Sequence, residues 1–276
     1  LMGENIKKNS KISALSEQDF LDVKKLIDKK FPKRSIETIL LITPPDVDIR
    51  LFNYNSAKRG RYPNYPPYGL MMLASHLRDE GIETSILNLN SIILKACLSS
   101  RNIDKFDYDH VWQKALENEI AAYKPDLIGL TCMFTQTHRS LTRVCARIKE
   151  IAPRVPIAAG GVHISNSLNN RESSEQLIND LNAEFLFRNE CEVAFKQFIK
   201  FVNIKANLAS LGQVVFNIEG KLVHFENQLV PQEKDLNVLP AYDLANPIEL
   251  SKWGKVGSYI GLVPEKKRFA TVLSNR

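Results

Sequence analysis

The sequence predicts an α/β protein built on a doubly wound, mostly parallel sheet of five strands, with an amino-terminal helical extension and a carboxyl-terminal β-hairpin and linker. Three observations predict it. Short apolar runs rich in β-branched residues alternate with longer segments of helical periodicity, which is typical of a parallel sheet with helices on both faces. Proline and glycine punctuate these segments. After residue 205 the alternation gives way to a hairpin pattern.

The expected strands are short and apolar. The first, TILLIT at residues 38–43, is β-branched and stops at Pro44-Pro45, as a buried strand would. Four further parallel strands are expected at residues 83–87, 126–130, 156–159 and 184–187. A later pair at residues 213–216 and 221–225 flanks the sequence NIEG, whose glycine suits a hairpin turn.

The expected helices lie between these strands. Residues 69–78 (GLMMLASHLR) repeat apolar side chains at helical spacing and are followed by Gly81, a residue type suited to cap a helix. Further helices are expected at residues 17–30, 109–123, 140–151 and 193–201. Because ligands of parallel sheets bind beyond the carboxyl ends of the strands, a site is expected in the loops that follow them.

Composition indicates a globular protein. The chain of 276 residues is 44% hydrophobic, enough for one large core with appended elements. No apolar run approaches the roughly 20 residues needed to cross a bilayer, and the lysine-rich amino terminus has no signal-peptide pattern. We therefore expect a cytoplasmic protein that does not associate with membranes.

Cysteine usage and charge exclude some functions. The scattered cysteines argue against a disulfide framework or a structural zinc site, and no metal-ligand cluster is expected: Cys97, Cys132, Cys145 and Cys191. The net charge of +6 is mild for this length. Nucleic-acid binding stays open but is not favoured, because no basic motif with interleaved aromatic residues accompanies the charge.

Two spaced motifs follow neighbouring strands. Thr131-Cys132-Met133 closes the third strand, Gly160-Gly161 closes the fourth, and 26 residues separate them. Paired glycines at the carboxyl end of a strand let a ligand approach the backbone where a Cβ would obstruct it. The alternative is that the pair forms only an ordinary turn.

The loop after the first strand is unusually long. Residues 44–67 lack apolar periodicity, yet they are rich in tyrosine and proline and contain a basic cluster of Lys58, Arg59 and Arg61. Loops of this length inside a compact domain are usually functional or disordered. Pro66-Pro67 directly precedes the helix and suits its first turn. The alternative is a proline-rich surface loop.

These motifs resemble those of the cobalamin-binding Rossmann-like domains of cobalamin-dependent radical S-adenosylmethionine (SAM) enzymes. In that family a Ser-x-Leu motif and a Gly-Gly pair are similarly spaced, and Pro-Pro-x-Gly-Leu begins the first helix, as Pro66 to Leu70 does here. The resemblance implies that cobalamin lies over the loops that follow the strands. It implies contacts from Pro44, Pro45, Tyr65, Pro67, Tyr68, Gly69, Leu70, Thr131, Cys132, Met133, Phe134, Thr135, Gln136, Gly160, Gly161, Val162, His163, Asn189 and Glu190.

Two departures from related motifs matter. The Asp-x-His-x-x-Gly motif, which supplies a histidine ligand to cobalt in mutases and methionine synthase, is absent. The radical SAM branch typically lacks it as well. His76 is expected inside a helix, whereas His138 and His163 follow strands and could touch a ligand. Where the family has Gly-Glu-Gly-Glu, this chain has Asn189-Glu190-Cys191-Glu192, in which acidic side chains also suit the start of a helix.

The end of the chain carries a further match. Residues 268–276 (RFATVLSNR) resemble the first strand of a radical SAM barrel, which in the family precedes a Cys-x-x-x-Cys-x-x-Cys motif holding a four-iron four-sulfur cluster. We therefore expect a piece of a longer enzyme, inactive by itself because it lacks those cysteines. The resemblance divides the chain into residues 1–36 (extension), 37–205 (cobalamin-binding domain), 206–267 (hairpin and linker) and 268–276 (start of the barrel).

The function implied by the resemblance is that of a methyltransferase. The complete enzyme would move a methyl group from methylcobalamin to an unactivated position of a small-molecule or peptide substrate, using SAM, the cluster and an external electron donor. Catalytic residues are not identifiable from this sequence. Three alternatives remain open: a radical SAM rearrangement or cyclisation without methyl transfer, a non-catalytic corrinoid carrier, and a nucleotide-binding Rossmann-like protein. The last lacks any G-x-G-x-x-G or P-loop sequence after a strand.

Overall fold

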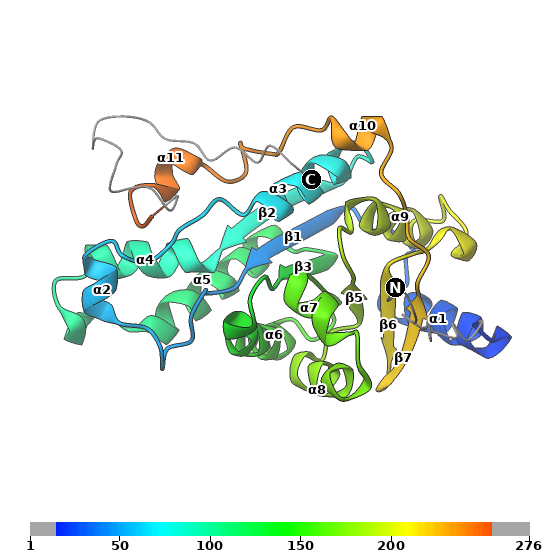
Figure 1. The fold of residues 1–276 in the computed structure, drawn as a ribbon, viewed down its shortest axis with the longest axis horizontal. Helices are drawn as coiled ribbons and strands as arrows, with labels where there is room; N and C mark the ends of the chain where they lie inside the picture. Colours follow the sequence, from blue (N-terminus) through cyan, green and yellow to red (C-terminus); the bar gives the residue numbers. More distant parts are fainter. Residues whose placement is uncertain (1–14, 256–276) are drawn as a thin grey trace, which may run out of the picture.

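A seven-stranded sheet forms the centre of the protein in the computed structural model, which describes residues 15–255 (Figure 1). The strand order is β2-β1-β3-β4-β5-β6-β7; the first five strands are parallel and the last two are antiparallel. The strands are β1 (Thr38–Thr43), β2 (Glu83–Asn88), β3 (Leu127–Thr131), β4 (Ile157–Gly160), β5 (Phe185–Phe187), β6 (Val214–Ile218) and β7 (Lys221–Phe225).

Helices cover both faces of the sheet, as the doubly wound prediction requires. Side chains of α1, α3 and α9 pack with one face, and those of α4, α5, α6, α7 and α8 pack with the other (Figure 1). The helices are α1 (Glu17–Lys30), α2 (Tyr54–Lys58), α3 (Tyr68–Arg78), α4 (Leu89–Ser99), α5 (Tyr108–Tyr123), α6 (His138–Ile151), α7 (Val162–Ser167), α8 (Arg171–Leu181), α9 (Glu192–Val202), α10 (Glu233–Leu236) and α11 (Pro247–Leu250).

The structure confirms the mostly parallel α/β fold and extends it. All five predicted parallel strands form, and the predicted hairpin continues the same sheet because β6 pairs with β5. The sheet therefore has seven strands rather than five. The domain boundary expected at residue 205 lies between β5 and β6, which are neighbours in this sheet. The sequence pattern does not predict the longer helices α4 and α8 or the short helices α2, α7, α10 and α11. The residues of α4 follow β2 without an intervening turn residue, so their apolar run gives no sign of a boundary.

The amino-terminal helix is an integral part of the core. Ser16 begins α1 with a capping box: its Oγ accepts a hydrogen bond from the Asp19 backbone N–H at 3.1 Å, and the Asp19 carboxylate accepts one from the Ser16 N–H at 2.9 Å. Val23, Leu26 and Ile27 are buried against the sheet. The segment expected to be an extension thus covers the face of the sheet near β6.

The linker after the hairpin runs along α3. The Ala241 N–H donates to the Met71 carbonyl at 3.1 Å, the Ser75 hydroxyl donates to the Leu239 carbonyl at 2.6 Å, and Arg78 pairs with Asp243. Among residues 15–255, no helix combines the length and apolarity that spanning a bilayer would require. The barrel strand predicted at residues 268–276 lies outside the described residues.

Candidate functional site

A cavity of about 490 Å³ opens at the carboxyl edge of the sheet, where sites of parallel sheets are found. It lies between the ends of β3 and β4, the start of α3, the start of α7 and the loop from β5 to α9. Its size falls within the roughly 300–1,000 Å³ of small-molecule sites. The residues that line it and that the sequence also singled out are Gly69, Leu70, Thr131, Met133, Gly160, Gly161, Val162, Asn189 and Glu190.

The two motif glycines have different reasons to be glycine. Gly161 has φ of +105°, and a Cβ there would lie 2.5 Å from the Cys132 carbonyl oxygen, so the fold itself excludes a side chain. A Cβ on Gly160 would meet only ordinary contacts, the nearest at 3.6 Å from Phe187. At Gly160 a small side chain would therefore fit against Phe187 and Cys191 and narrow the cavity, whereas Gly161 lets the chain turn into α7.

The loop from β5 to α9 is tied to the turn after β4. The Ser165 hydroxyl accepts a hydrogen bond from the Asn189 N–H at 2.8 Å and donates to the Gly161 carbonyl at 3.2 Å. Asn189 has φ of +58°, a conformation that asparagine tolerates better than most residues. The next residue but one, Cys191, is a cavity-lining thiol whose pKa is raised to about 12 by burial, so it stays neutral.

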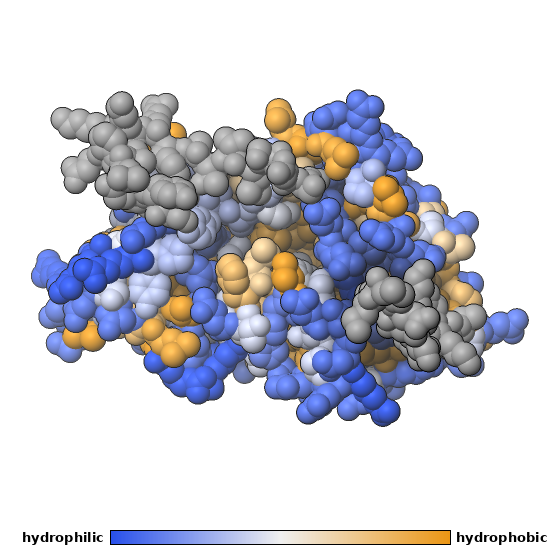
Figure 2. Space-filling view, viewed as in Figure 1, coloured by the Kyte–Doolittle hydropathy of each residue, from blue (hydrophilic) through white to orange (hydrophobic). Residues whose placement is uncertain are grey.

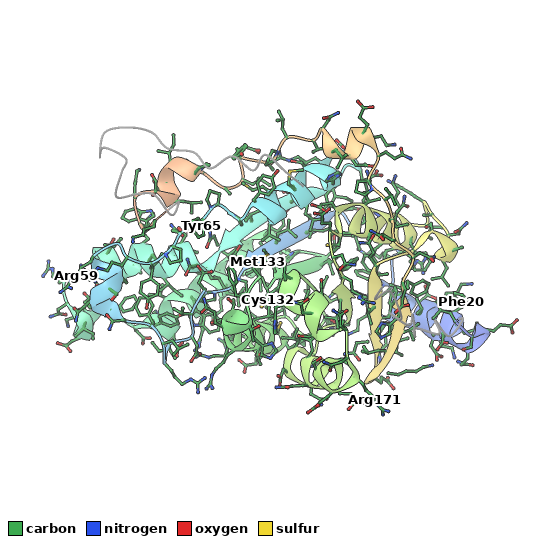
Figure 3. All side chains as sticks on the ribbon, in the orientation of Figure 1. Phe20, Arg59, Tyr65, Cys132, Met133 and Arg171 are labelled. Atoms are coloured by element: carbon green, nitrogen blue, oxygen red, sulfur yellow. The ribbon has the colours of Figure 1, made fainter. Side chains whose placement is uncertain are left out.

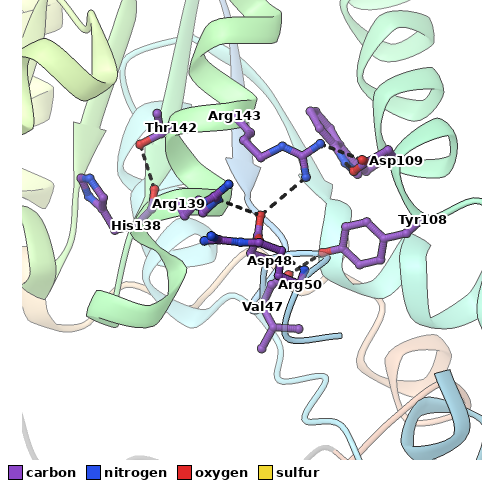
Figure 4. A network of polar contacts seen from close by, with 10 residues as sticks. Val47, Asp48, Arg50, Tyr108, Asp109, His138, Arg139, Thr142 and Arg143 are labelled. Atoms are coloured by element: carbon purple, nitrogen blue, oxygen red, sulfur yellow. Dashed lines mark hydrogen bonds and ion pairs between the residues drawn. The ribbon is translucent and has the colours of Figure 1, made fainter. Parts of the chain in front are cut away.

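The long loop after β1 is anchored at its start by a charge network (Figure 4). Asp48 is 2% exposed, and its carboxylate pairs with Arg50 at 2.8 Å, Arg139 at 3.5 Å and Arg143 at 3.6 Å. Burial raises the pKa of this carboxyl, but hydrogen bonds from Arg50 and the charge of Arg139 outweigh burial and hold the pKa below its ordinary value. Tyr108 donates to the Val47 carbonyl from α5. The loop thus has a defined path between α5 and α6.

The rest of that loop is ordered by a short helix and ring stacking. Asn53 caps α2 by accepting from the Ser56 N–H at 2.9 Å, and the Phe52 and Tyr62 rings stack with centroids 5.2 Å apart. Residues 65–67 then lead into α3, in whose first turn Gly69 and Leu70 reach the cavity. The predicted contact residues Tyr65, Pro67 and Tyr68 stand at this approach but do not line the cavity.

Exposed apolar side chains occur in the lining of the cavity, at Met133 and Val162, and beside it in the sequence, at Phe134. Met133 is 51% exposed, Phe134 60% and Val162 50%. Figure 2 shows orange and pale atoms near the middle of the viewed face with blue atoms around them, and Figure 3 labels Met133 and Tyr65 in this central area. Single exposed apolar residues are common, but Met133 after β3 and Val162 at the start of α7 both line the cavity, where a ligand would contact them.

Other predicted contact residues lie outside the cavity lining. Pro44 and Pro45 are buried after β1, and Cys132 is buried with its thiol 3.4 Å from the Phe134 carbonyl oxygen. Thr135 and Gln136 are exposed in a short 3₁₀ turn before α6.

The histidine that follows the glycine pair turns away from the cavity. His163 Nε2 lies 2.9 Å from His138 Nδ1, and His138 Nε2 lies 2.8 Å from the Asp180 carboxylate. Burial and the neighbouring His138 lower the pKa of His163, so it is neutral at pH 7. His76 is buried in α3. No histidine lines the cavity, and no group of three or more His, Cys, Asp or Glu within the described part of the chain is arranged to hold a metal ion.

The sequence reasoning missed the floor and walls of the cavity. Leu73, Gly129, Ala158, Phe187 and Phe195 line it, together with other residues from the same elements. The available signal was Gly129 inside the otherwise bulky strand β3 and the run of small residues that fills β4 after Ile157, since small residues in a strand mark a close approach by another group.

The comparisons with known proteins concern the family and the fold. Residues 60–172 match the family model described as the B12 binding domain. No curated protein matches the sequence. The fold resembles that of the radical SAM methyltransferase TsrM from Kitasatospora setae with cobalamin and a [4Fe-4S] cluster bound, at 18% identity and a TM-score of 0.50 over 69% of this chain and 31% of that one.

A second solved structure resembles the chain over a longer stretch. It is the cobalamin-dependent SAM radical enzyme OxsB with aqua-cobalamin and SAM bound, at 17% identity and a TM-score of 0.50 over 81% of this chain and 26% of that one. The chain thus spans less than a third of either protein, and at these identities the likeness concerns the fold. Together, the family match over residues 60–172 and the shared fold confirm the resemblance to cobalamin-binding domains that the sequence indicates.

Proposed function

We propose that this chain binds cobalamin, with the nucleotide tail of the cofactor inserted in the cavity and the corrin ring over its mouth. The observation that carries the proposal is the mostly apolar cavity at Gly160, where a Cβ would already touch Phe187 and Cys191, and whose lining includes the exposed Met133 and Val162. The apolar lining suits the flat benzimidazole base of the tail. Met133 and Val162 would contact the ring, and the loop between β5 and α9 would close one side.

The charges around the cavity favour this ligand over a nucleotide diphosphate. The lining residues include no lysine, arginine or histidine, whereas Glu190 and Glu192 stand at its edge. Pyrophosphate groups are held by backbone N–H groups of glycine-rich loops or by cations, and a carboxylate pair would repel them. Cobalamin carries a single phosphodiester, which could remain at the mouth in water while the base is buried.

We further propose that the complete protein is a cobalamin-dependent radical SAM enzyme, with methyl transfer as the reaction. The support is the family match, together with a fold shared with a methyltransferase whose structure contains cobalamin and a [4Fe-4S] cluster. The bound cofactor would supply the methyl group. This chain's residues would bind and orient the cofactor and exclude water from one face of it. SAM, an iron-sulfur cluster, an electron donor and a small-molecule or peptide substrate belong to this proposal.

The proposal is tested by cofactor loading. The chain, purified and incubated with hydroxocobalamin, should retain about one equivalent after gel filtration, read from corrin absorbance. Gly160→Val should lower the affinity at least tenfold, which corresponds to about 1.4 kcal/mol, because a branched side chain would fill the cavity. Ala122→Val, an enlargement at an exposed position of α5, should bind as the wild type does.

The coordination state gives a second readout. Cob(II)alamin in the protein should show no nitrogen superhyperfine splitting in its electron paramagnetic resonance spectrum, because the base would lie in the cavity and no histidine lines it. Splitting from a coordinated nitrogen, or wild-type affinity in a folded Gly160→Val protein, would reject the proposed placement. Failure to retain any corrinoid would reject cobalamin binding itself.

A further inference from the structure

The floor of the cavity is a row of small residues that crosses adjacent strands. Gly129 of β3 pairs in register with Leu41 of β1 on one side and with Ala158 of β4 on the other. Further toward the edge, Thr131 pairs with Gly160. Because opposite residues of neighbouring strands project from the same face, Gly129 and Ala158 together leave a trough bordered by Leu41 and Phe187.

Side chains of the two flanking strands limit the width of the trough. A Cβ on Gly129 would lie 2.9 Å from the Leu41 Cδ2 atom, and a Cβ on Gly160 would lie 3.6 Å from the Phe187 Cβ. Leu73 of α3 and Phe195 of α9 close the trough from above. The side chains on these sides of the trough thus present hydrocarbon to whatever enters it.

The trough offers few hydrogen-bonding groups. The Ser165 hydroxyl is occupied by the Asn189 N–H and the Gly161 carbonyl. The Thr131 hydroxyl and the neutral Cys191 thiol are the polar side chains next to the floor, and a thiol is a weak donor. The remaining polar side chains of the lining stand at the exposed edge of the cavity: Asn166, Asn189, Glu190 and the half-buried Glu192.

We propose that this trough selects the lower base of the corrinoid, accepting a benzimidazole and rejecting a purine. The inference rests on the proposed cobalamin function and adds a specificity to it. A benzimidazole attached to the tail has one ring nitrogen that needs a partner, which the single Thr131 hydroxyl can supply. Adenine brings an amino group and further ring nitrogens, which would lose water without finding partners beside Leu41, Ala158 and Phe187.

The experiment compares three corrinoids on the wild-type chain: cobalamin, the adenine-containing cobamide, and cobinamide, which has no nucleotide tail. Equilibrium dialysis with corrin absorbance gives each dissociation constant. We expect cobalamin to bind at least tenfold more tightly than the adenine cobamide, and cobinamide to bind no better than the adenine form.

Two variants assign the selectivity to the floor. Ala158→Ser adds one hydroxyl to the trough. It should lower the ratio of the dissociation constants of the adenine cobamide and cobalamin by at least threefold. Ala183→Ser makes the same change at a buried alanine that belongs to the core on the other face of the sheet. It should leave the ratio of the two dissociation constants unchanged. Unfolding by urea shows whether each variant keeps the fold.

The outcomes separate the two proposals. Equal affinity for both cobamides, or tighter binding of the adenine form, would overturn the selectivity and leave cobalamin binding intact. If a folded Ala158→Ser protein kept the wild-type ratio of dissociation constants, the selectivity would arise elsewhere and the role of the trough would be overturned. If none of the three corrinoids binds, the proposed function fails, and the selectivity fails with it.

Discussion

The amino edge of the sheet holds acids with hydrogen-bonding partners, whereas the carboxyl edge holds both a paired acid, Asp48, and one without a partner among the described residues, Asp46. At the amino edge, Glu184 accepts hydrogen bonds from Lys30 at 2.5 Å, Lys149 at 2.6 Å and the Ile157 N–H at 2.8 Å. Asp126 there accepts from two backbone N–H groups at the start of β1. At the carboxyl edge, Asp46 follows β1, and among residues 15–255 no hydrogen bond or ion pair to its carboxylate is found.

The hollows at the two edges of the sheet also differ, both in volume and in the side chains that line them. The amino-edge hollow is larger, about 700 Å³ against about 490 Å³, but lysines, acids and asparagines line it. The carboxyl-edge cavity is lined by glycine, alanine, leucine and phenylalanine. Volume alone would therefore favour the amino-edge hollow, whereas the apolar lining favours the carboxyl-edge cavity as a ligand site. The amino-edge hollow presents charged and amide side chains, of which Glu184 is paired with two lysines, and the carboxyl-edge cavity offers the apolar space that a ligand would need.

The largest effect is expected at the amino edge. Glu184→Gln leaves two partly buried lysines without a carboxylate and should lower the free energy of unfolding by about 3 kcal/mol. Urea unfolding measures this loss, and the affinity of the folded variant for cobalamin should not change. Glu175→Gln, which removes an exposed partner of Arg171, should cost less than about 1 kcal/mol.

The pH dependence gives a second check on Glu184. Burial raises its pKa, but the charges and hydrogen bonds of Lys149 and Lys30 outweigh burial, so the net pKa lies below the ordinary 4.5. The carboxylate therefore contributes stability above pH 4.5 that is lost as the pH falls below it. Glu184→Gln should flatten this acid limb. An equally steep limb in the variant would contradict the assignment.

A smaller effect distinguishes the two motif glycines. Gly161→Ala should lower the free energy of unfolding by about 2–3 kcal/mol, because its φ of +105° is strained for alanine and its Cβ would meet the Cys132 carbonyl. Gly160→Ala should change stability by less than about 1 kcal/mol, since its Cβ has room. Similar losses in both variants would show that the pair acts as a single turn.

Much of the fold could be predicted because its signals are local. The strand at residues 38–43 and the helix at residues 17–30 form with the expected bounds, since β-branched runs and helical periodicity are read within a few residues. That β6 would pair with β5 is a tertiary event that no local pattern encodes. The same holds for the burial of α1 against the sheet, which depends on its apolar stripe finding the face beside β6.

The candidate site was predictable where motifs mark it. Thr131, Met133 and the glycine pair were identified, and all of them line the cavity. The floor of the cavity was not predicted, because Gly129 and Ala158 form it only when the strand register places them side by side on β3 and β4. Nor could the sequence show that His163 would point to His138 rather than into the cavity, since both directions are open to a loop histidine.

The smallest expected effect tests the unpartnered acid of the carboxyl edge. Burial raises the pKa of Asp46 to about 6, from an ordinary 3.8. An acid with a raised pKa favours the folded state while it is protonated, and this contribution is lost as the pH rises through 6. Replacing the ionised form with a neutral amide should therefore help the fold at high pH. Asp46→Asn should raise the free energy of unfolding by about 1–2 kcal/mol at pH 8, with little difference from the wild type near pH 4. Urea unfolding of both proteins from pH 4 to pH 8 measures this, with the exposed Asp104→Asn as the control. A variant that is less stable than the wild type at pH 8 would mean that the Asp46 carboxylate has a partner in solution, and the contrast between the two edges would then narrow to their hollows.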